Sequence, residues 1–467
     1  KAVKIDPKTG AVIPGSGDLY NGLVIPGTGF PSSAKGRFPE STSGTYDYLF
    51  RGGKYPSYYS NIQWGQIQPR VGLAYQWNNK TVIRAGGGRF FTRLGQSDSV
   101  FLGGNPPFQP TANISFGNVD NPGGTSANSL PLTVTTQSRV FKNPEAWNWN
   151  FTVERDFYFK SVLSVAYVGR RGLHLQREAN INQPTTDVRN ANLTANLDAV
   201  RPFLGYNSVR ETDNVASSRY NSLQVSWNRR FSQGIQFGAA YTLSKSSDDG
   251  SDQRDIIPDT YFAHNLYGPS TFDTRHILIA SFLYDLPLFR SQNNLAGKIL
   301  GGWQVSGIAQ FQTGQPNSVT VGNDYAGVGQ DGSLQNGGGQ FWVKNGNPGI
   351  VGQLAHNGAN DPALWFTTTN KDGSPIFTAP AKGTFNLQNN IRDIIYNPGF
   401  NNWNLGLFKA FRISEKTGFE FRAEGYDAFN HPNWNGADFN PTSATFGKIT
   451  GKNNDHRELQ LSLRFFF

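Results

Sequence analysis

Four aspartates stand close together in one short stretch, Asp248-Asp-Gly-Ser-Asp-Gln-Arg-Asp255. Carboxylate oxygens are ligands that Ca²⁺ prefers, and the ion takes about 6–8 oxygens in proteins. Asp248, Asp249, Asp252 and Asp255 are therefore weak calcium candidates, and calcium is the one cofactor that the sequence suggests. Their spacing differs from that of an EF-hand loop, so a solvated acidic loop is the favoured alternative.

Other catalytic chemistry has little support in the residue types. The chain has no Cys, which excludes thiolate nucleophiles, thiolate zinc sites and disulfides. The six His residues stand singly, without an HExxH arrangement or paired ligand spacing. Gly86-Gly87-Gly88 matches neither a dinucleotide fingerprint nor a P-loop, and no GxSxG elbow occurs. We therefore predict that the protein is not an enzyme and has no catalytic residues or resident metal.

The net charge of +9 does not indicate a nucleic-acid partner. The 42 Lys and Arg residues are spread along the chain, and a nucleic-acid footprint would gather them on one face. The sequence has two basic doublets, Arg170-Arg171 and Arg229-Arg230, and both fall at the ends of predicted strands.

Two sets of residues could instead contact a solute. Charged residues alternate with apolar ones near the end of the chain, which places them on one polar face: Glu420, Arg422, Glu424, Glu458 and Arg464. Such a face is typical of a barrel lumen, either as structural lining, which we favour, or as a solute path. Aromatic residues in predicted loops could stack on a ligand or pin the loops together, and both alternatives stay open: Phe341, Trp342, Trp365, Phe366 and Trp434.

The elements that must position these residues are strands. In Trp147-Asn-Trp-Asn-Phe-Thr-Val-Glu154, apolar and polar residues alternate strictly, which is typical of a strand with two different faces. The same pattern predicts eleven strands and almost no helix. Their ranges are 67–77, 81–92, 146–156, 160–170, 218–231, 235–245, 273–286, 300–313, 402–412, 418–429 and 456–467.

The connections between the predicted strands alternate between short and long. The long ones are 93–145, 171–217, 246–272, 314–401 and 430–455, and residues 1–66 form a further long loop segment. Outer-membrane barrels keep short turns on the periplasmic side and long loops outside, and aromatic residues gather at their interfaces. The sequence thus predicts an all-β, antiparallel outer-membrane β-barrel. Because bacterial barrels have an even number of strands, we expect eleven strands to be part of a wall whose N-terminal portion is missing.

The last predicted strand carries apolar side chains at alternate positions up to the final residue: Leu459, Leu461, Leu463, Phe465 and Phe467. This pattern resembles the C-terminal assembly signal that the barrel-insertion machinery recognises in outer-membrane barrels.

Several stretches, in order along nearly the whole chain, resemble the TonB-dependent outer-membrane receptors of the Oar-like type, which carry a carboxypeptidase-regulatory-like domain. They are Gly27-Thr-Gly-Phe-Pro-Ser-Ser-Ala-Lys-Gly36, Gln68-Pro-Arg-Val-Gly-Leu-Ala-Tyr75, Tyr167-Val-Gly-Arg-Arg-Gly-Leu-His174, Asp273-Thr-Arg-His276, Gly301-Gly-Trp-Gln-Val-Ser-Gly307, Phe421-Arg-Ala-Glu424 and Ala428-Phe-Asn-His-Pro-Asn433. The resemblance implies that this chain is the C-terminal half of a barrel of roughly 22 strands with a plug. It also implies lipopolysaccharide, the insertion machinery and the TonB complex as partners. The sequence itself shows no plug, TonB-contact segment or N-terminal accessory domain.

We therefore expect transport of an unidentified solute into the periplasm. An outer-membrane adhesin or surface assembly protein, or a passive pore, is the alternative, and a soluble carbohydrate-binding β protein is a weaker one.

Overall fold

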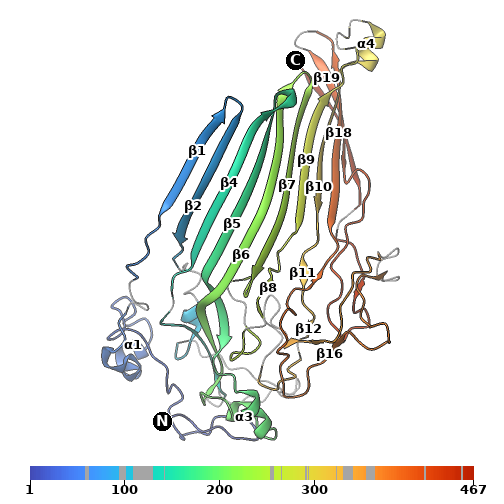
Figure 1. The fold of residues 1–467 in the computed structure, drawn as a ribbon. Coiled ribbons are helices and arrows are strands. Elements are labelled where there is room, and N and C mark those ends of the chain that lie inside the picture. Colours follow the sequence, from blue (N-terminus) through green and yellow to red (C-terminus); the bar gives the residue numbers. More distant parts are fainter. Residues whose placement is uncertain are drawn as a thin grey trace.

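One large curved sheet and a layer of loops at one of its ends make up the fold (Figure 1). The computed structural model describes residues 1–57, 63–93, 101–108, 130–140, 142–252, 257–263, 266–289, 292, 294–321, 323–329, 340–353, 363–414, 417–453 and 456–467. The N-terminus lies in the loop layer, and the C-terminus lies at the opposite end of the sheet, among the short turns. We call these ends of the sheet the loop end and the turn end.

The sheet contains 13 strands, of which eleven follow one another as antiparallel neighbours. The eleven are β1 (Arg70–Asn78), β2 (Thr81–Phe91), β4 (Glu145–Phe157), β5 (Ser161–Asn180), β6 (Tyr206–Ser232), β7 (Ile235–Asp248), β9 (His276–Asp285), β10 (Trp303–Gln312), β18 (Phe400–Arg412), β19 (Gly418–Tyr426) and β21 (Glu458–Phe466). Each predicted strand overlaps one of them, and the predicted all-β, antiparallel class is confirmed. β1 and β21 end this path, and among the described residues they do not pair with each other, so no closed barrel is seen.

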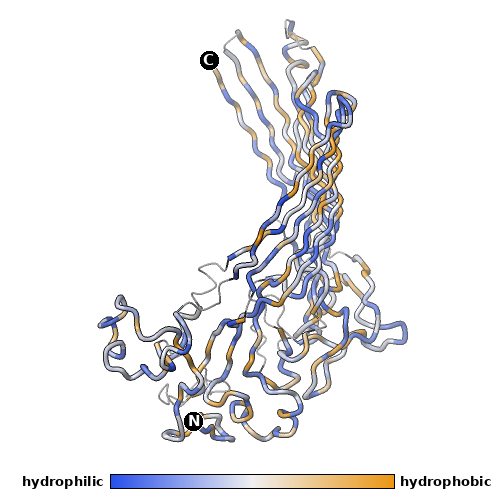
Figure 2. The backbone as a smooth tube through the Cα atoms, turned by 60° about the vertical axis from the view of Figure 1, so that its left-hand side comes forward, coloured by the Kyte–Doolittle hydropathy of each residue, from blue (hydrophilic) through white to orange (hydrophobic). Residues whose placement is uncertain are grey.

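The register gives the sheet one apolar and one polar face, and Figure 2 shows hydrophobic and hydrophilic residues alternating along the strands. Val165 of β5 lies opposite Val225 of β6, which lies opposite Tyr241 of β7. Ser226, one residue further, faces the other side, because successive side chains of a strand alternate. On the apolar face large side chains stay exposed, such as Leu73 at 62% and Leu461 at 70%. An apolar face of this extent without protein cover is expected where lipid covers it.

Two strands run further than the sequence predicted. The range 171–217 was expected to be a loop, but β5 continues to Asn180 and β6 already begins at Tyr206. The register between these strands shifts on both sides of Leu175, and His174 has a positive φ of 55°. A bulge of this kind adds a residue and reverses which face each side chain takes, so the alternation that marks a strand breaks there.

The loop layer is a set of small ribbons with their own cores. β3 (Leu132–Gln137) runs parallel to the start of β6, and β8 (Gly268–Pro269) pairs with β7. The remaining short strands are β11 (Pro316–Asn317), β12 (Thr320–Val321), β13 (Gln340–Phe341), β14 (Val343–Lys344), β15 (Ala363–Leu364), β16 (Phe377–Thr378), β17 (Ile395–Tyr396) and β20 (Lys448–Ile449). They pair as β11–β17, β12–β13, β14–β16 and β15–β20, so segments far apart in the chain hold one another.

Helices are few and short. They are α1 (Glu40–Ser43), α3 (Thr186–Ala191) and α4 (Leu295–Leu300), with 3-10 turns η1 (Asp47–Gly53), η2 (Phe101–Gly104), η4 (Tyr158–Lys160) and η5 (Leu197–Ala199). Among the described residues, no helix has the length and apolar character needed to cross a membrane.

Candidate functional site

The loop layer contains a cavity of about 570 Å³ beside the start of β6. Its walls come from the N-terminal segment around Leu23–Pro26, from residues 105–108, from β3 and from β6. This volume is in the range of roughly 300–1,000 Å³ that is usual for small-molecule sites. The cavity is therefore the candidate solute site.

The floor of the cavity is a small apolar core. Leu132 and Val134 of β3 are buried against Tyr206 and Val209 of β6. Asn105 fixes the free edge of β3: its side chain donates to the carbonyl of Thr135 (2.6 Å) and accepts from the Thr135 amide (2.8 Å). The cavity thus rests on hydrogen-bonded strands rather than on a loose loop.

Aromatic and charged side chains line the opening. The Arg139 guanidinium lies 4.5 Å from the ring centroid of Tyr55. Phe108 meets Phe30 edge-to-face at 5.6 Å, which fixes a further aromatic wall. A cation held over a ring retains free N–H donors, so Arg139 can both stack on a solute and hydrogen-bond to it.

Glu211 is the distinctive polar residue of the cavity. It lies in the loop-end extension of β6, opposite Thr136 of β3, and among the described residues its carboxylate makes no hydrogen bond or ion pair. Burial, and secondarily the nearby charge of Asp213, raises the pKa of Glu211. A carboxylate in a cavity without a protein partner is a candidate to bind a ligand that carries a hydrogen-bond donor or a positive charge.

Glu211→Gln should stabilise the loop layer at pH 7. The folded state binds the Glu211 proton more tightly than the unfolded chain does, so ionisation costs stability as the pH rises above the ordinary value of 4.5, and the cost is absent below it. We expect a higher melting temperature than wild type in detergent at pH 7 and no difference at pH 4. Glu40→Gln, which removes a carboxylate outside the cavity, is the matched control. An equal gain at both pH values would contradict this account.

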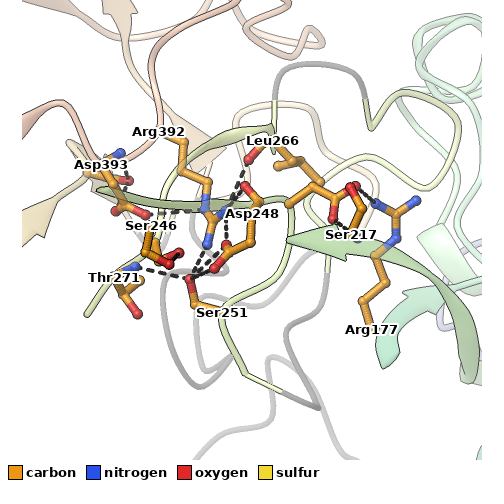
Figure 3. Close-up of polar contacts among 12 residues, drawn as sticks. Arg177, Ser217, Ser246, Asp248, Ser251, Leu266, Thr271, Arg392 and Asp393 are labelled. Carbon is orange, nitrogen blue, oxygen red and sulfur yellow. Dashed lines mark hydrogen bonds and ion pairs between the residues drawn. The ribbon is translucent and has the colours of Figure 1, made fainter. Parts of the chain in front are cut away.

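A second polar cluster ties the long loop 314–401 to the sheet (Figure 3). The Arg392 guanidinium bridges the Asp248 carboxylate (2.8 Å), the Leu266 carbonyl (3.1 Å) and the Ser251 hydroxyl (2.7 Å). Both charged side chains are buried, at 9% and 2% exposure. Nearby, Tyr396 donates to Asp273 (2.7 Å), and burial together with this hydrogen bond raises the pKa of Tyr396.

This cluster engages two of the four calcium candidates, Asp248 and Asp249, and for Asp252 calcium binding stays a prediction. Asp248 pairs with Arg392, and Asp249 accepts from the Ser217 amide (2.6 Å) and faces Arg177 at 3.6 Å. Asp255 lies outside the described residues. Within the described part of the chain, no group of three His, Asp or Glu side chains is arranged to hold a metal ion. Calcium binding stays a prediction, and calcium would have to displace arginine from Asp248 and Asp249.

The predicted loop aromatics contribute mainly to packing. Phe366 is fully buried in a core with Val319, Ile395 and Ile449, and Phe341 is buried in a neighbouring core. Both rings are packed against protein side chains. Trp342, Trp365 and Trp434 pack against the first core but are only partly buried, so ligand stacking stays a prediction for them. The Nε1 groups of Trp342 and Trp434 are buried without a hydrogen-bond partner.

The strand charges meet as the alternation predicts. Glu420 of β19 lies opposite Arg464 of β21, and Glu424 lies opposite Gln460. Glu420 also pairs with Arg422 on its own strand, and Glu458 lies opposite Tyr426 on the same face. The structure thus gathers these five charges on the polar face.

The residues of the predicted assembly signal share the apolar face of β21. Leu459, Leu461, Leu463, Phe465 and Phe467 are all at least half exposed. Phe465 packs on Phe419 of β19 with ring centroids 5.0 Å apart. Their role in assembly stays a prediction.

The residues of the cavity carry no mark in the sequence that predicts them as a site. Tyr55, Phe108, Arg139 and Glu211 come from four separate segments, and parallel pairing of β3 with β6 brings Glu211 beside the segment that leads to Arg139. No local spacing marks such a site. The run of polar residues that follows the bulge in β5 is the one signal in the sequence. It would have predicted that the strands continue into the loop layer.

A sheet with an exposed apolar face, a polar face and all long loops at one end defines a membrane β-barrel wall. Comparison with family models agrees: residues 3–460 match the family described as outer membrane beta barrel domain. The chain belongs to this family, and its location is the bacterial outer membrane.

Solved structures with similar folds include the Escherichia coli outer membrane transporter YddB, with 9% identity over 84% of this chain and a TM-score of 0.43. The ferric-catecholate import receptor Fiu of E. coli has 10% identity over 85% of this chain and a TM-score of 0.36, and the match covers 34% of Fiu. The FrpB iron transporter of Neisseria meningitidis, in its F5-1 variant, has 10% identity over 86% of this chain, 39% coverage of FrpB and a TM-score of 0.38. This chain spans 39% of the length of YddB. No curated protein sequence matches this chain.

Proposed function

We propose that this chain forms wall and ligand-facing loops of a TonB-dependent outer-membrane transporter or receptor for an unidentified solute. The observation that carries the proposal is the loop-end cavity with its unpartnered Glu211, above a sheet whose apolar face suits lipid. Capture of a solute needs such a cavity on the outer side, whereas a simple membrane anchor does not.

The orientation of the sheet, its lumen face, the size of the barrel and its partners are part of the same proposal. The loop end faces the cell exterior and the turn end faces the periplasm, because barrels of this kind place their long loops outside. The polar face with Glu420, Arg422 and Arg464 lines a lumen. The chain is the C-terminal half of an Oar-like barrel of roughly 22 strands. The insertion machinery, lipopolysaccharide and the TonB complex are its partners.

The test is uptake from a defined medium by cells that make the full-length protein. Mass spectrometry of the medium before and after growth identifies solutes that are depleted only when the protein is present. We expect a depletion that disappears on TonB deletion and is reduced by Glu211→Gln but not by Glu40→Gln. Depletion that survives TonB deletion would favour a passive pore. Cell adhesion without any depletion would favour the adhesin.

A further inference from the structure

The apolar face of the sheet ends, at the loop end, in a row of basic side chains. Arg171 of β5 lies directly opposite Arg219 of β6, and Lys245 of β7 lies opposite Asn221 of β6, one row closer to the turn end. These three side chains share the face that carries Val165 and Val225, and all three are exposed.

The distance of Arg171 and Arg219 from the turn end matches the thickness of the hydrocarbon core of a membrane. Ser161 begins β5 at the turn end, beside the exposed aromatic residues Phe157 and Tyr158. From Ser161 to Arg171 the chain advances by ten residues. At about 3.4 Å per residue and a tilt of roughly 40°, this is a height of about 25 Å, the usual height of the apolar band. Arg171 and Arg219 therefore lie where the outer headgroups begin.

The three basic groups lack acidic partners. Among the described residues, none of them has a hydrogen bond or ion pair with its side chain. On the same face, by contrast, Arg89 of β2 is paired with Glu145 of β4. Like charges directly opposite each other in an antiparallel pair repel. An anion bound between the Arg171 and Arg219 side chains would relieve this repulsion.

We propose that Arg171, Arg219 and Lys245 bind the phosphate groups of the glycolipid that forms the outer leaflet. Guanidinium groups bind phosphate through two parallel hydrogen bonds, and a pair of them can grip one phosphate between neighbouring strands. Trp147, opposite Arg171, supplies an aromatic ring at the interfacial level, where Trp is favoured. The proposal rests on the orientation given under Proposed function but not on transport.

The test is retention of lipid by the purified full-length protein in detergent, measured by native mass spectrometry. The probes are lipid A with both phosphates, its dephosphorylated form, and phosphatidylglycerol. We expect Arg171→Gln/Arg219→Gln to bind phosphorylated lipid A about 30-fold more weakly than wild type, the value for two basic groups near an anionic surface. The dephosphorylated form should bind weakly to both proteins.

Arg170→Gln is the matched control for Arg171→Gln alone, because Arg170 is the adjacent residue on the opposite face and each substitution removes one positive charge. It should retain lipid A like wild type. If the double variant fails to insert, Arg171→Lys/Arg219→Lys keeps the charge and removes the two-point contact, and a partial loss is expected. Equal retention of lipid A by wild type and either double variant would overturn the proposal. Stronger binding of phosphatidylglycerol than of lipid A would also overturn the lipid-binding proposal. It would leave the proposed transport function, which the uptake experiment tests, unaffected.

Discussion

Arg392→Gln is expected to destabilise the loop layer by about 3–5 kcal/mol, the usual cost of removing one partner from a buried ion pair. The substitution leaves the Asp248 carboxylate, which is 2% exposed, without its guanidinium. It also removes the donors that reach the Leu266 carbonyl and the Ser251 hydroxyl. Limited proteolysis across a temperature series, with the cut sites identified by mass spectrometry, should show the loop 314–401 opening well below the wild-type temperature.

Two comparisons separate the lost pair from a general effect. Lys371→Gln removes a positive charge from an exposed position of the same loop and should leave the opening temperature within about a degree of wild type, as surface changes usually do. Arg392→Met/Asp248→Leu removes both charges of this pair and should recover part of the loss, because the Asp248 carboxylate is no longer buried without its partner. Recovery should be incomplete, because the buried Asp393 carboxylate, 3.3 Å from Nε of Arg392, also loses its ion pair. An Arg392→Gln protein that opens like Lys371→Gln would show that the pair does not hold the loop.

Val225→Arg is expected to cost about 2–4 kcal/mol of unfolding free energy in a lipid bilayer, the range measured for arginine at the middle of a barrel's lipid face. Val225 lies between Val165 and Tyr241 on the apolar face, and its level in the sheet is near the middle of the apolar band between Ser161 and Arg171 of β5. Urea unfolding of the full-length protein in vesicles, followed by tryptophan fluorescence, measures the change.

Ser226→Arg is the control, one residue away on the polar face. We expect it to cost far less, because water or polar groups can solvate the guanidinium there. A larger cost for Ser226→Arg than for Val225→Arg would mean that the faces are assigned the wrong way round, and the lipid-binding row at Arg171 would lose its basis as well.

The sequence predicts the sheet well because each strand carries its own signal. Alternation needs only neighbouring residues, as in Trp147–Glu154, and the strand β4 (Glu145–Phe157) lies at this place. The signal fails where backbone geometry changes without a change of composition. The bulge around Leu175 inverts the alternation, so the second half of β5 was predicted to be a loop.

The loop layer could not be predicted in the same way. Its largest core joins Val319, Phe366, Ile395 and Ile449, which are far apart in the chain and follow no period. Aromatic residues in the loops were recognised, but composition alone does not separate a ring that packs inside from one that lines a cavity. Glu211 was missed for the related reason that an unpartnered carboxylate is defined by what surrounds it.

The two outer strands of the sheet, β1 and β21, are edge strands that can pair with other strands. Among the residues that the structure describes, β1 and β21 each pair with one strand, and the backbone N–H and C=O groups along their other side face no strand. The hydrocarbon core of a membrane cannot hydrogen-bond to those groups, and each group without a hydrogen bond there costs several kcal/mol of free energy. A lipid bilayer therefore solvates the apolar face of this sheet well but solvates the unpaired edges of β1 and β21 poorly. Any form that is stable in the membrane must pair both outer strands, either with each other or with further strands.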